Sequence, residues 1–119
     1  TVVRYVKARP RHKATAYKVL KTIATKQGVK YKLRIGYVSA NKTIEAYYRR
    51  PAQKVRVIRN GGILIHTKKT FARLNAIKHL KKGTVIRVSE LQDLNGITRF
   101  YIGNGKYITS NKTYVKRIK

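Results

Sequence analysis

The chain has 119 residues, and its 30 Lys and Arg residues outnumber only three acidic ones, which gives a formal net charge of +27. Such a charge opposes compaction, so it argues against a stand-alone enzyme and predicts a polyanionic partner: nucleic acid, an anionic cell-wall polymer or an acidic membrane surface. The absence of Cys excludes a disulfide framework and thiolate metal sites, and no apolar run approaches the roughly 20 residues that span a bilayer. Hydrophobic residues still make up 42% of the chain, which predicts a folded protein and not a disordered basic tail.

In chain order, the first predicted elements belong to an internal repeat. Three blocks recur in the same order at a nearly constant offset: residues 15–19 (TAYKV) with 84–88 (TVIRV), residues 28–35 with the stretch that begins at Gly96, and residues 36–43 (GYVSANKT) with 106–113 (KYITSNKT). We therefore predict two copies, residues 1–50 and 51–119, with the junction at Pro51 and the copies packed together. The first copy has 14 basic residues and one acidic residue, and the second has 16 and two, so the basic character belongs to both.

Six segments after Pro51 are rich in β-branched and aromatic residues, which predicts strands. They are residues 54–58, 63–67, 83–88, 98–102, 106–109 and 114–118. Between them, residues 60–62 (NGG), 94–96 (LNG) and 103–105 (GNG) supply the positive-φ positions that tight turns need, and the last of these joins the clearest hairpin. Short strands at this spacing predict an all-β fold with a small barrel in each copy.

One segment allows two interpretations. In residues 71–80, apolar side chains recur every three positions, at Phe71, Leu74, Ile77 and Leu80. This spacing is compatible with one short amphipathic helix. The same residues could instead form an extended arm that leads into Lys81 and Lys82, and the run is too short for periodicity to decide.

The second copy carries a resemblance to a known family. The stretch AIKHLKKGTVIRV, followed by NGITRFYIGNGKYITSNKTYV, resembles bacterial SH3-like cell-wall modules. Its end, GNGKYITSNKTYVK, is similar to the C-terminal cell-wall-anchoring repeats of lactobacillar surface-layer (S-layer) proteins. The resemblance covers most of residues 63–118 and, more weakly, residues 15–44. The first copy departs from the pattern, because it has His-Lys-Ala-Thr at residues 12–15 where the second has Lys-Lys-Gly-Thr.

This resemblance implies two SH3-like barrel repeats in tandem, in a secreted, extracellular module that anchors a surface protein to the Gram-positive cell wall. The implied receptor is teichoic or lipoteichoic acid, with peptidoglycan as an alternative, and no insertion into the membrane. The residues independently suit a phosphodiester polymer, since each Lys or Arg that meets a phosphate releases a condensed counterion. Two copies on one chain also raise the effective local concentration for a repetitive ligand.

We expect the polymer contacts to come from basic patches at the strand ends of the two copies. The predicted polyanion-binding residues are Lys42, Arg49 and Arg50 in the first copy and Lys106, Lys112, Lys116 and Arg117 in the second. Tyr47 and Tyr114 are predicted to lie beside sugar or glycerol units, because a phenol ring offers an apolar face and a hydroxyl group. For Lys112, a solvated surface charge without a ligand is an equal alternative.

Other residues of the repeated motif are expected to serve the fold. Tyr37 and Tyr107 are predicted to fill the two cores, as large aromatic side chains usually do. Asn41 and Asn111 are predicted to cap turns.

Catalytic interpretations have little support in the sequence. His12, His66 and His79 have no partner at metal-ligand spacing, and three acidic residues leave little room for paired-carboxylate chemistry. We therefore expect no enzymatic activity, no cofactor and no metal.

The alternative function is nucleic-acid binding by SH3-like barrels, because nucleic acids are polyphosphates too. Base stacking would require exposed aromatic side chains on one face. The alternation of Tyr with Val and Ile predicts instead that many rings point inward. A third interpretation is a surface that binds an acidic protein or a peptidoglycan peptide.

Overall fold

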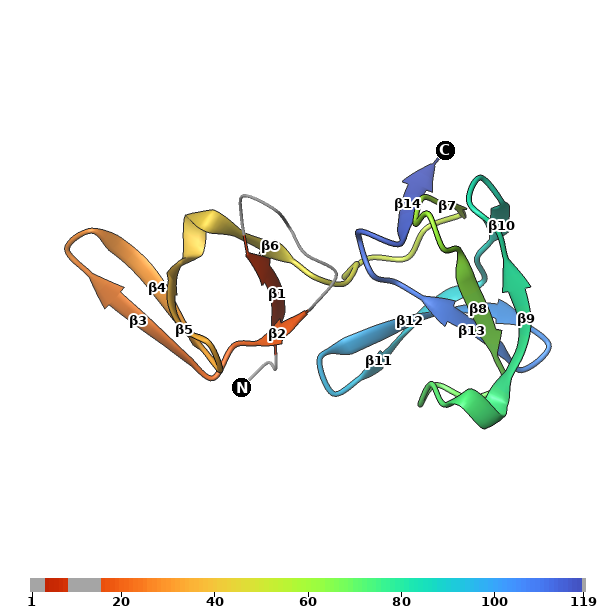
Figure 1. Cartoon of the computed structure of the whole chain (residues 1–119), viewed down its shortest axis with the longest axis horizontal. Coiled ribbons are helices and arrows are strands. Elements are labelled where there is room, and N and C mark those ends of the chain that lie inside the picture. Colours follow the sequence, from red (N-terminus) through yellow and green to blue (C-terminus); the bar gives the residue numbers. More distant parts are fainter. Residues whose placement is uncertain (1–3, 9–15, 119) are drawn as a thin grey trace. The chain divides into compact units, whose positions relative to one another are not determined.

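The computed structural model describes residues 4–8 and 16–118, and within them the backbone but not the side chains of Ala8 and Lys42. This described part is all-β, with fourteen strands and two short 3-10 turns, which confirms the predicted fold class (Figure 1). No helix in these residues is long and apolar enough to cross a bilayer. The chain divides into two compact units, Thr1–Ala46 and Tyr47–Lys119, so residues 47–50 belong to the second unit although the sequence placed the junction at Pro51.

The first unit contains two three-stranded antiparallel sheets. In one, β1 (Tyr5–Ala8) lies between β2 (Tyr17–Lys18) and β6 (Thr43–Glu45). In the other, β4 (Gly28–Leu33) lies between β3 (Lys21–Thr25) and β5 (Gly36–Ser39). The turn η1 (Ala40–Lys42) connects β5 to β6. Among the described residues of this unit the buried apolar side chains are Val6, Leu33 and Ala46, so its core is small.

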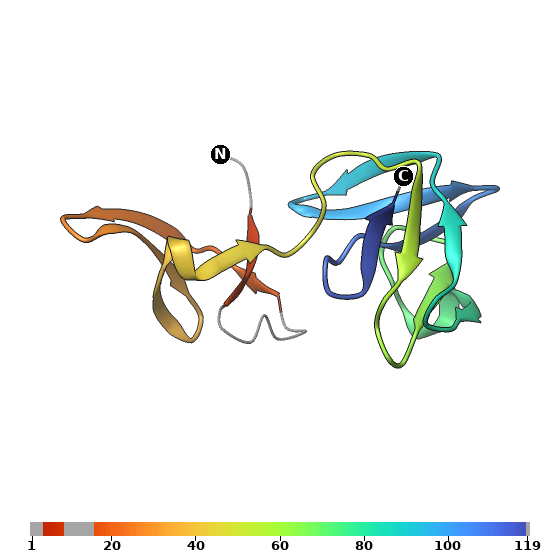
Figure 2. The ribbon, with the colours of Figure 1, turned by 90° about the horizontal axis from the view of Figure 1, so that it is seen from above.

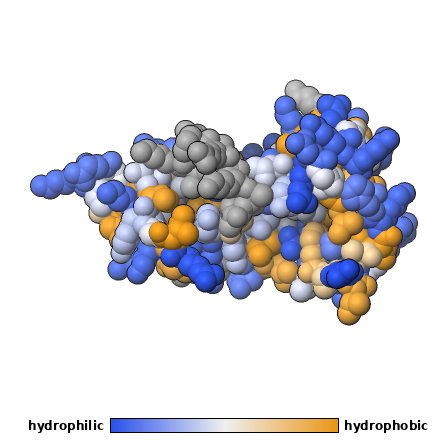
Figure 3. All heavy atoms as spheres, in the orientation of Figure 1, coloured by the Kyte–Doolittle hydropathy of each residue, from blue (hydrophilic) through white to orange (hydrophobic). Residues whose placement is uncertain are grey.

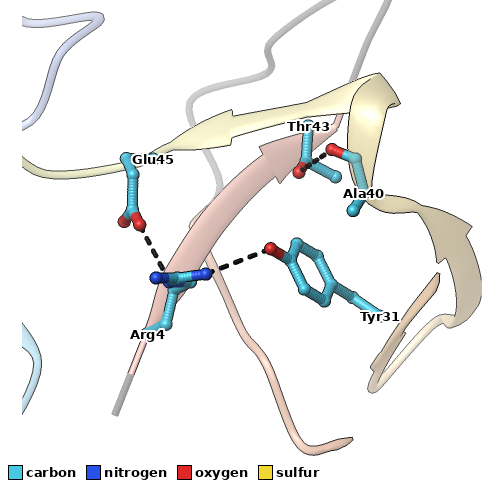
Figure 4. A network of polar contacts seen from close by, with 5 residues as sticks. All are labelled: Arg4, Tyr31, Ala40, Thr43 and Glu45. Atoms are coloured by element: carbon cyan, nitrogen blue, oxygen red, sulfur yellow. Dashed lines mark hydrogen bonds and ion pairs between the residues drawn. The ribbon is translucent and has the colours of Figure 1, made fainter. Parts of the chain in front are cut away.

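Polar contacts supplement this small core (Figure 4). Arg4, just before β1, forms an ion pair with Glu45 on β6 at 2.8 Å and donates a hydrogen bond to the Tyr31 hydroxyl on β4 at 3.1 Å. Arg4 therefore connects the two sheets of the unit. Its side chain is about half exposed, and a pair of this kind contributes little, about 0–1 kcal/mol. Lys7 on β1 is fully buried, and burial lowers the pKa of its ammonium group to about 8.

The second unit contains a three-stranded and a five-stranded sheet (Figures 1 and 2). In the smaller sheet, β7 (Lys54–Val57) lies between β10 (Val85–Arg87) and β14 (Val115–Ile118). The larger sheet has the order β11 (Glu90–Leu94), β12 (Ile97–Gly103), β13 (Lys106–Thr109), β8 (Ile63–His66) and β9 (Ala76–Leu80). Both sheets contribute to one buried core of seven side chains: Val55, Val57, Ile63, Ile65, Phe100, Ile108 and Val115.

The two units share one strand order. The sheet β2-β1-β6 corresponds to β10-β7-β14, and β3-β4-β5 corresponds to β11-β12-β13. The second unit adds the hairpin β8–β9 between β7 and β10, where the first unit has only residues 9–16. The repeat in the sequence thus has a counterpart in the topology. In both units the described strands form two separate sheets, and hydrogen bonding does not close them into the barrel that we expected.

The strands predicted after Pro51 are all present, with ends shifted by at most two residues. The predicted hairpin is the pair β12–β13, and its turn places Asn104 and Gly105 at φ values of 53° and 69°. The turn between β11 and β12 uses Asn95 and Gly96 in the same way. Asn and Gly tolerate this left-handed conformation better than other residues, which is why these positions could be recognised.

Residues 71–80 do not form the amphipathic helix that their apolar spacing allowed. They form the 3-10 turn η2 (Arg73–Asn75) followed by β9, so the extended alternative is correct. The Asn75 side chain closes the loop before β9, since it accepts a hydrogen bond from the Ala72 N–H at 3.2 Å and donates one to the Thr70 carbonyl at 2.9 Å. β9 then pairs with β8. Pairing satisfies the backbone groups of both strands, which a helix could not do for β8.

The prediction that Tyr37 fills a core is wrong, because its side chain is 58% exposed. Its counterpart Tyr107 is half-buried and pairs with His66 on β8. The first unit has no counterpart of β8 among its described residues, so β5 is an edge strand there. The two tyrosines occupy equivalent positions in the repeat, and their different burial follows from the hairpin β8–β9, which has no counterpart among the described residues of the first unit.

Candidate polyanion-binding site

Tyr48 lies at the start of the second unit, between the core and a group of basic side chains. Its backbone N–H donates to the Ser110 carbonyl at 3.0 Å, and its own carbonyl accepts from the Thr98 hydroxyl at 2.7 Å. Its ring centroid lies 5.8 Å from that of the fully buried Phe100. Its hydroxyl accepts a hydrogen bond from the Arg117 N–H at 3.2 Å. These contacts hold the backbone and the ring of Tyr48 in place.

Two cations lie close to this ring. Lys112 Nζ is 5.5 Å and Arg117 Cζ is 5.6 Å from the Tyr48 ring centroid. Contacts of this kind contribute about 0.5–1 kcal/mol each at exposed sites. The turn that carries Lys112 is closed by Asn111, whose side-chain oxygen accepts from the Thr113 N–H at 3.0 Å and from its hydroxyl at 2.9 Å, so the predicted turn cap is confirmed. We call Tyr48, Lys112 and Arg117 the Tyr48 cluster.

Arg117 also lines a shallow pocket of about 420 Å³ in the second unit. The other lining residues are Pro51, Ala52, Gln53 and Ile118. Three of these five residues are apolar, and Gln53 and Arg117 add an amide and a guanidinium group. A guanidinium can bind a phosphate through two parallel N–H donors, and the apolar walls suit a short carbon segment beside that phosphate.

Lys116 and Arg117 are neighbours in β14 but serve different surfaces. Arg117 is opposite the buried Val55 on β7, whereas Lys116 is opposite the exposed Arg56. Because side chains alternate along a strand, the two basic residues point to opposite faces of the sheet. β14 is an edge strand of this sheet, so each face of the sheet has a basic side chain at this edge.

Several other cations of the second unit are engaged in the fold. The Arg99 guanidinium lies 3.7 Å from the Phe71 ring centroid, and Arg99 Nε donates to the Lys69 carbonyl at 2.9 Å. Burial lowers the pKa of Arg99, an effect that Tyr47 partly offsets. Lys82 donates to the Asn60 side chain at 3.0 Å. The formal charge therefore overstates the number of cations available to a ligand.

Tyr114, a predicted carbohydrate contact, is half-buried with Arg59 over its ring at 4.4 Å. The same Arg59 guanidinium lies 3.5 Å from the Gly62 carbonyl, to which it donates a hydrogen bond. One face of the Tyr114 ring is thus in contact with a cation of the protein itself. Its role toward a sugar or glycerol unit stays a prediction.

The other predicted site residues are spread over the two units. Lys42 belongs to η1, but its side chain lies outside the described residues. Arg49 is half-buried and Arg50 is exposed, both in the segment that leads from the Tyr48 cluster into β7. Lys106 begins β13, at the hairpin of the other sheet. Tyr47 is half-buried and forms an isolated β-bridge with Asn111. The structure therefore brings together Lys112 and Arg117 and separates Lys106 from them.

Sequence reasoning missed Tyr48 and the basic residues of β7 and β10. The importance of Tyr48 depends on partners 50 or more residues away in the chain, Thr98 and Ser110 among them, and no local pattern shows it. For β7 a signal existed, because the alternation Lys-Val-Arg-Val at residues 54–57 predicts two cations on one face of the strand.

Comparisons with known proteins identify the second unit. Residues 47–115 match the model of a family that is described as a domain of unknown function, DUF5776. Searches of curated proteins and of solved structures give no match. The family match starts at the first residue of the second unit, ends at the first residue of β14 and covers more than half of the chain. The chain therefore belongs to the DUF5776 family.

Proposed function

We propose that this chain is a non-catalytic module that anchors a surface protein to the Gram-positive cell envelope by electrostatic binding of teichoic or lipoteichoic acid. The main support is the excess of cations on folded strands and turns. Three carboxylates cannot neutralise thirty Lys and Arg. The two carboxylates of the second unit also have local roles, because Glu90 accepts a hydrogen bond from Gln92 and Asp93 accepts one from the Gly96 N–H at 2.9 Å.

A teichoic acid suits such a surface because it is a flexible chain of phosphodiesters. Its recognition requires many individually weak phosphate contacts rather than one deep pocket, and each contact releases a counterion. The shallow pocket beside Arg117 and the exposed cations fit that requirement. Two basic units on one chain would engage one polymer at two places, which raises the overall affinity without new types of contact.

The burial of the aromatic side chains favours phosphate recognition over base recognition. All eleven Tyr and Phe residues lie in the described part of the chain, and Tyr37 alone among them is exposed. Proteins that bind single strands through their bases usually present several aromatic rings to solvent. This surface presents cations, so a phosphodiester wall polymer is the better candidate than nucleic acid.

The direct test is co-sedimentation of the full chain with purified Gram-positive cell walls, before and after chemical removal of teichoic acid. We expect binding to intact walls that falls steeply with salt and is lost on stripped walls. Undiminished retention on stripped walls would show that peptidoglycan is the receptor. Much tighter binding to RNA or duplex DNA used as competitors would favour the nucleic-acid alternative.

A pair of charge-matched variants tests whether the Tyr48 cluster contributes. Lys112→Gln with Arg117→Gln removes two cations from the cluster. Lys78→Gln with Lys81→Gln removes two exposed cations from β9 and the turn after it. The cluster variant should bind intact walls more weakly than the control, since both have lost the same formal charge. Equal binding would show that the Tyr48 cluster is not part of the receptor surface.

A further inference from the structure

The sheet β10-β7-β14 has one face toward the core and one face away from it. On β7, Val55 and Val57 are buried, so the alternating residues Lys54 and Arg56 point to the other face. We call this second face the outer face. Its residues follow from the strand register, because directly opposite residues of antiparallel strands share a face.

The register places cations opposite each other on this outer face. Arg56 is paired with Lys116 on β14, and Lys54 is paired with Arg87 on β10. Arg56, Arg87 and Lys116 are exposed and Lys54 is half-buried. The three strands contain no acidic residue. The outer face therefore carries two directly opposed pairs of like charge, which we call the two cationic pairs.

Two cationic pairs on three short strands are unfavourable for the fold alone. Directly opposite side chains have β carbons about 4.5–5.5 Å apart, and like charges at this distance destabilise a sheet. The Lys54–Arg87 and Arg56–Lys116 pairs lie two residues apart along β7, about 6.7 Å, and on opposite sides of β7, because Arg87 is on β10 and Lys116 is on β14. Since neighbouring strands are about 4.8 Å apart, the midpoints of the two pairs are about 8 Å apart. An anion between the members of each pair would convert the repulsion into attraction. In Figure 3, hydrophilic side chains gather over the part of the second unit where these three strands lie.

The spacing of the two pairs matches a polymer of phosphodiesters. In a glycerol phosphate chain, six single bonds separate successive phosphorus atoms, which gives a separation on the order of 7 Å when the chain is extended. This value is comparable with the distance of about 8 Å between the midpoints of the two cationic pairs. Ile118 lies opposite Lys54 at the second pair and also lines the pocket that contains Arg117, whose side chain belongs to the other face of the sheet.

We propose that the outer face of β10-β7-β14 binds an extended phosphodiester chain, with one phosphate at the Arg56–Lys116 pair and the next at the Lys54–Arg87 pair. The inference rests on the proposed function, and it names the surface and the register of the ligand. Other cations of the unit are less available: Arg59 and Arg99 contact aromatic rings, and Lys82 binds Asn60. The cationic pairs are instead held at strand positions, so their spacing is set by the backbone.

The test uses the full chain and poly(glycerol phosphate) prepared by deacylation of lipoteichoic acid. Binding is measured between 0.05 and about 0.5 M salt, the range over which counterion release changes affinity most. The variant Arg56→Gln with Lys116→Gln is compared with the charge-matched control Lys78→Gln with Lys81→Gln. In the proposed register these two residues hold one phosphate, so their loss should lower the slope of log K against log salt by about 0.7, which corresponds to about five-fold weaker binding at 0.1 M salt relative to a 1 M reference.

Folding of the variants is checked by thermal melting without ligand. Arg56→Gln with Lys116→Gln removes one like-charged pair, so its midpoint should equal or exceed that of the unmodified chain. A lower midpoint would overturn the argument that the pair is unfavourable without an anion.

The binding outcomes separate two kinds of failure. If the unmodified chain binds poly(glycerol phosphate) and the outer-face variant keeps the slope of the control, the outer face is not the site although the proposed function stands. If the unmodified chain does not bind poly(glycerol phosphate) but binds a single-stranded RNA of similar length, the proposed function is wrong and the inference is wrong with it. A loss of slope confined to the outer-face variant supports the inference.

Discussion

Substitution of Tyr48 should reveal how strongly one ring couples the basic surface to the core of the second unit. In Tyr48→Leu the chain loses the ring contact with Phe100, the two cation contacts from Lys112 and Arg117, and the hydrogen bond from the Arg117 N–H to the hydroxyl. An aromatic pair contributes about 0.5–1.5 kcal/mol, each cation contact about 0.5–1 kcal/mol and the hydrogen bond about 1 kcal/mol. We expect the free energy of unfolding of the second unit to fall by about 3 kcal/mol.

Tyr48→Phe provides the matched control, because it keeps the ring and removes only the hydroxyl. This variant should lose about 1 kcal/mol. The measurement is a urea titration of the full chain, followed through the amide NMR signals of β12 and β13, and urea is chosen because a salt denaturant would screen the cations. If the leucine variant were no less stable than the phenylalanine variant, the contacts of the Tyr48 ring with Phe100, Lys112 and Arg117 would not stabilise the second unit. The reasoning behind the Tyr48 cluster would then be refuted.

Three further predictions follow from other parts of the structure. Gly62→Ala should destabilise the second unit by about 2–4 kcal/mol in urea denaturation, because the residue has φ +75° and an added β carbon would lie 2.3 Å from the Leu80 carbonyl. Gly61→Ala is the control, because no atom lies within 4 Å of the β carbon added there. Equal losses of stability in the two variants would contradict the prediction. The pKa of Lys7 is lowered from 10.5 to about 8, so between these pH values the unfolded chain binds more protons than the folded chain. The free energy of unfolding should therefore rise with pH, by up to roughly 3 kcal/mol relative to Lys7→Met. Parallel curves of stability against pH for the two proteins between pH 7 and 10 would contradict this prediction. Residues 47–119 alone should give a dispersed NMR spectrum with cooperative melting, because the seven buried core side chains and the family match fall within this unit; a collapsed spectrum would show that the first unit is required.

Local sequence patterns were sufficient for most of the second unit. Runs of β-branched and aromatic residues located most of its strands, and the Asn-Gly pairs at residues 95–96 and 104–105 located two turns, the second of them in the predicted hairpin. β11 (Glu90–Leu94) escaped notice because ELQDL contains no β-branched or aromatic residue. It is a strand because all five of its residues pair with β12, an interaction that the segment itself does not show.

Long-range pairing explains what the sequence could not predict. The apolar spacing of residues 71–80 was compatible with a helix, and pairing of β9 with β8 made it a strand. Tyr37 and Tyr107 are equivalent in the repeat, but β8 covers only the second. Local patterns describe each segment by itself, and these outcomes depended on segments far away in the chain.

The candidate site was predictable only in part for the same reason. The sequence identified Lys112, Lys116 and Arg117 as basic residues near the C-terminal strand. It could not place Lys112 and Arg117 at one tyrosine ring, because that arrangement depends on contacts of Tyr48 with residues far away in the chain. Nor could it place Lys116 opposite Arg56, because that pairing depends on the register between β14 and β7. The sequence shows which residues carry a positive charge, but only the folded structure shows which of them lie together on one surface.

An NMR titration of the full chain with poly(glycerol phosphate) tests the central claim most directly. If the outer face binds successive phosphates, the amide signals of β7, β10 and β14 should shift first and most, with Lys54, Arg56, Arg87 and Lys116 at the centre, and the shifts should disappear as salt is added. Shifts confined to β11 and β12, or shifts that persist at high salt, would contradict the account.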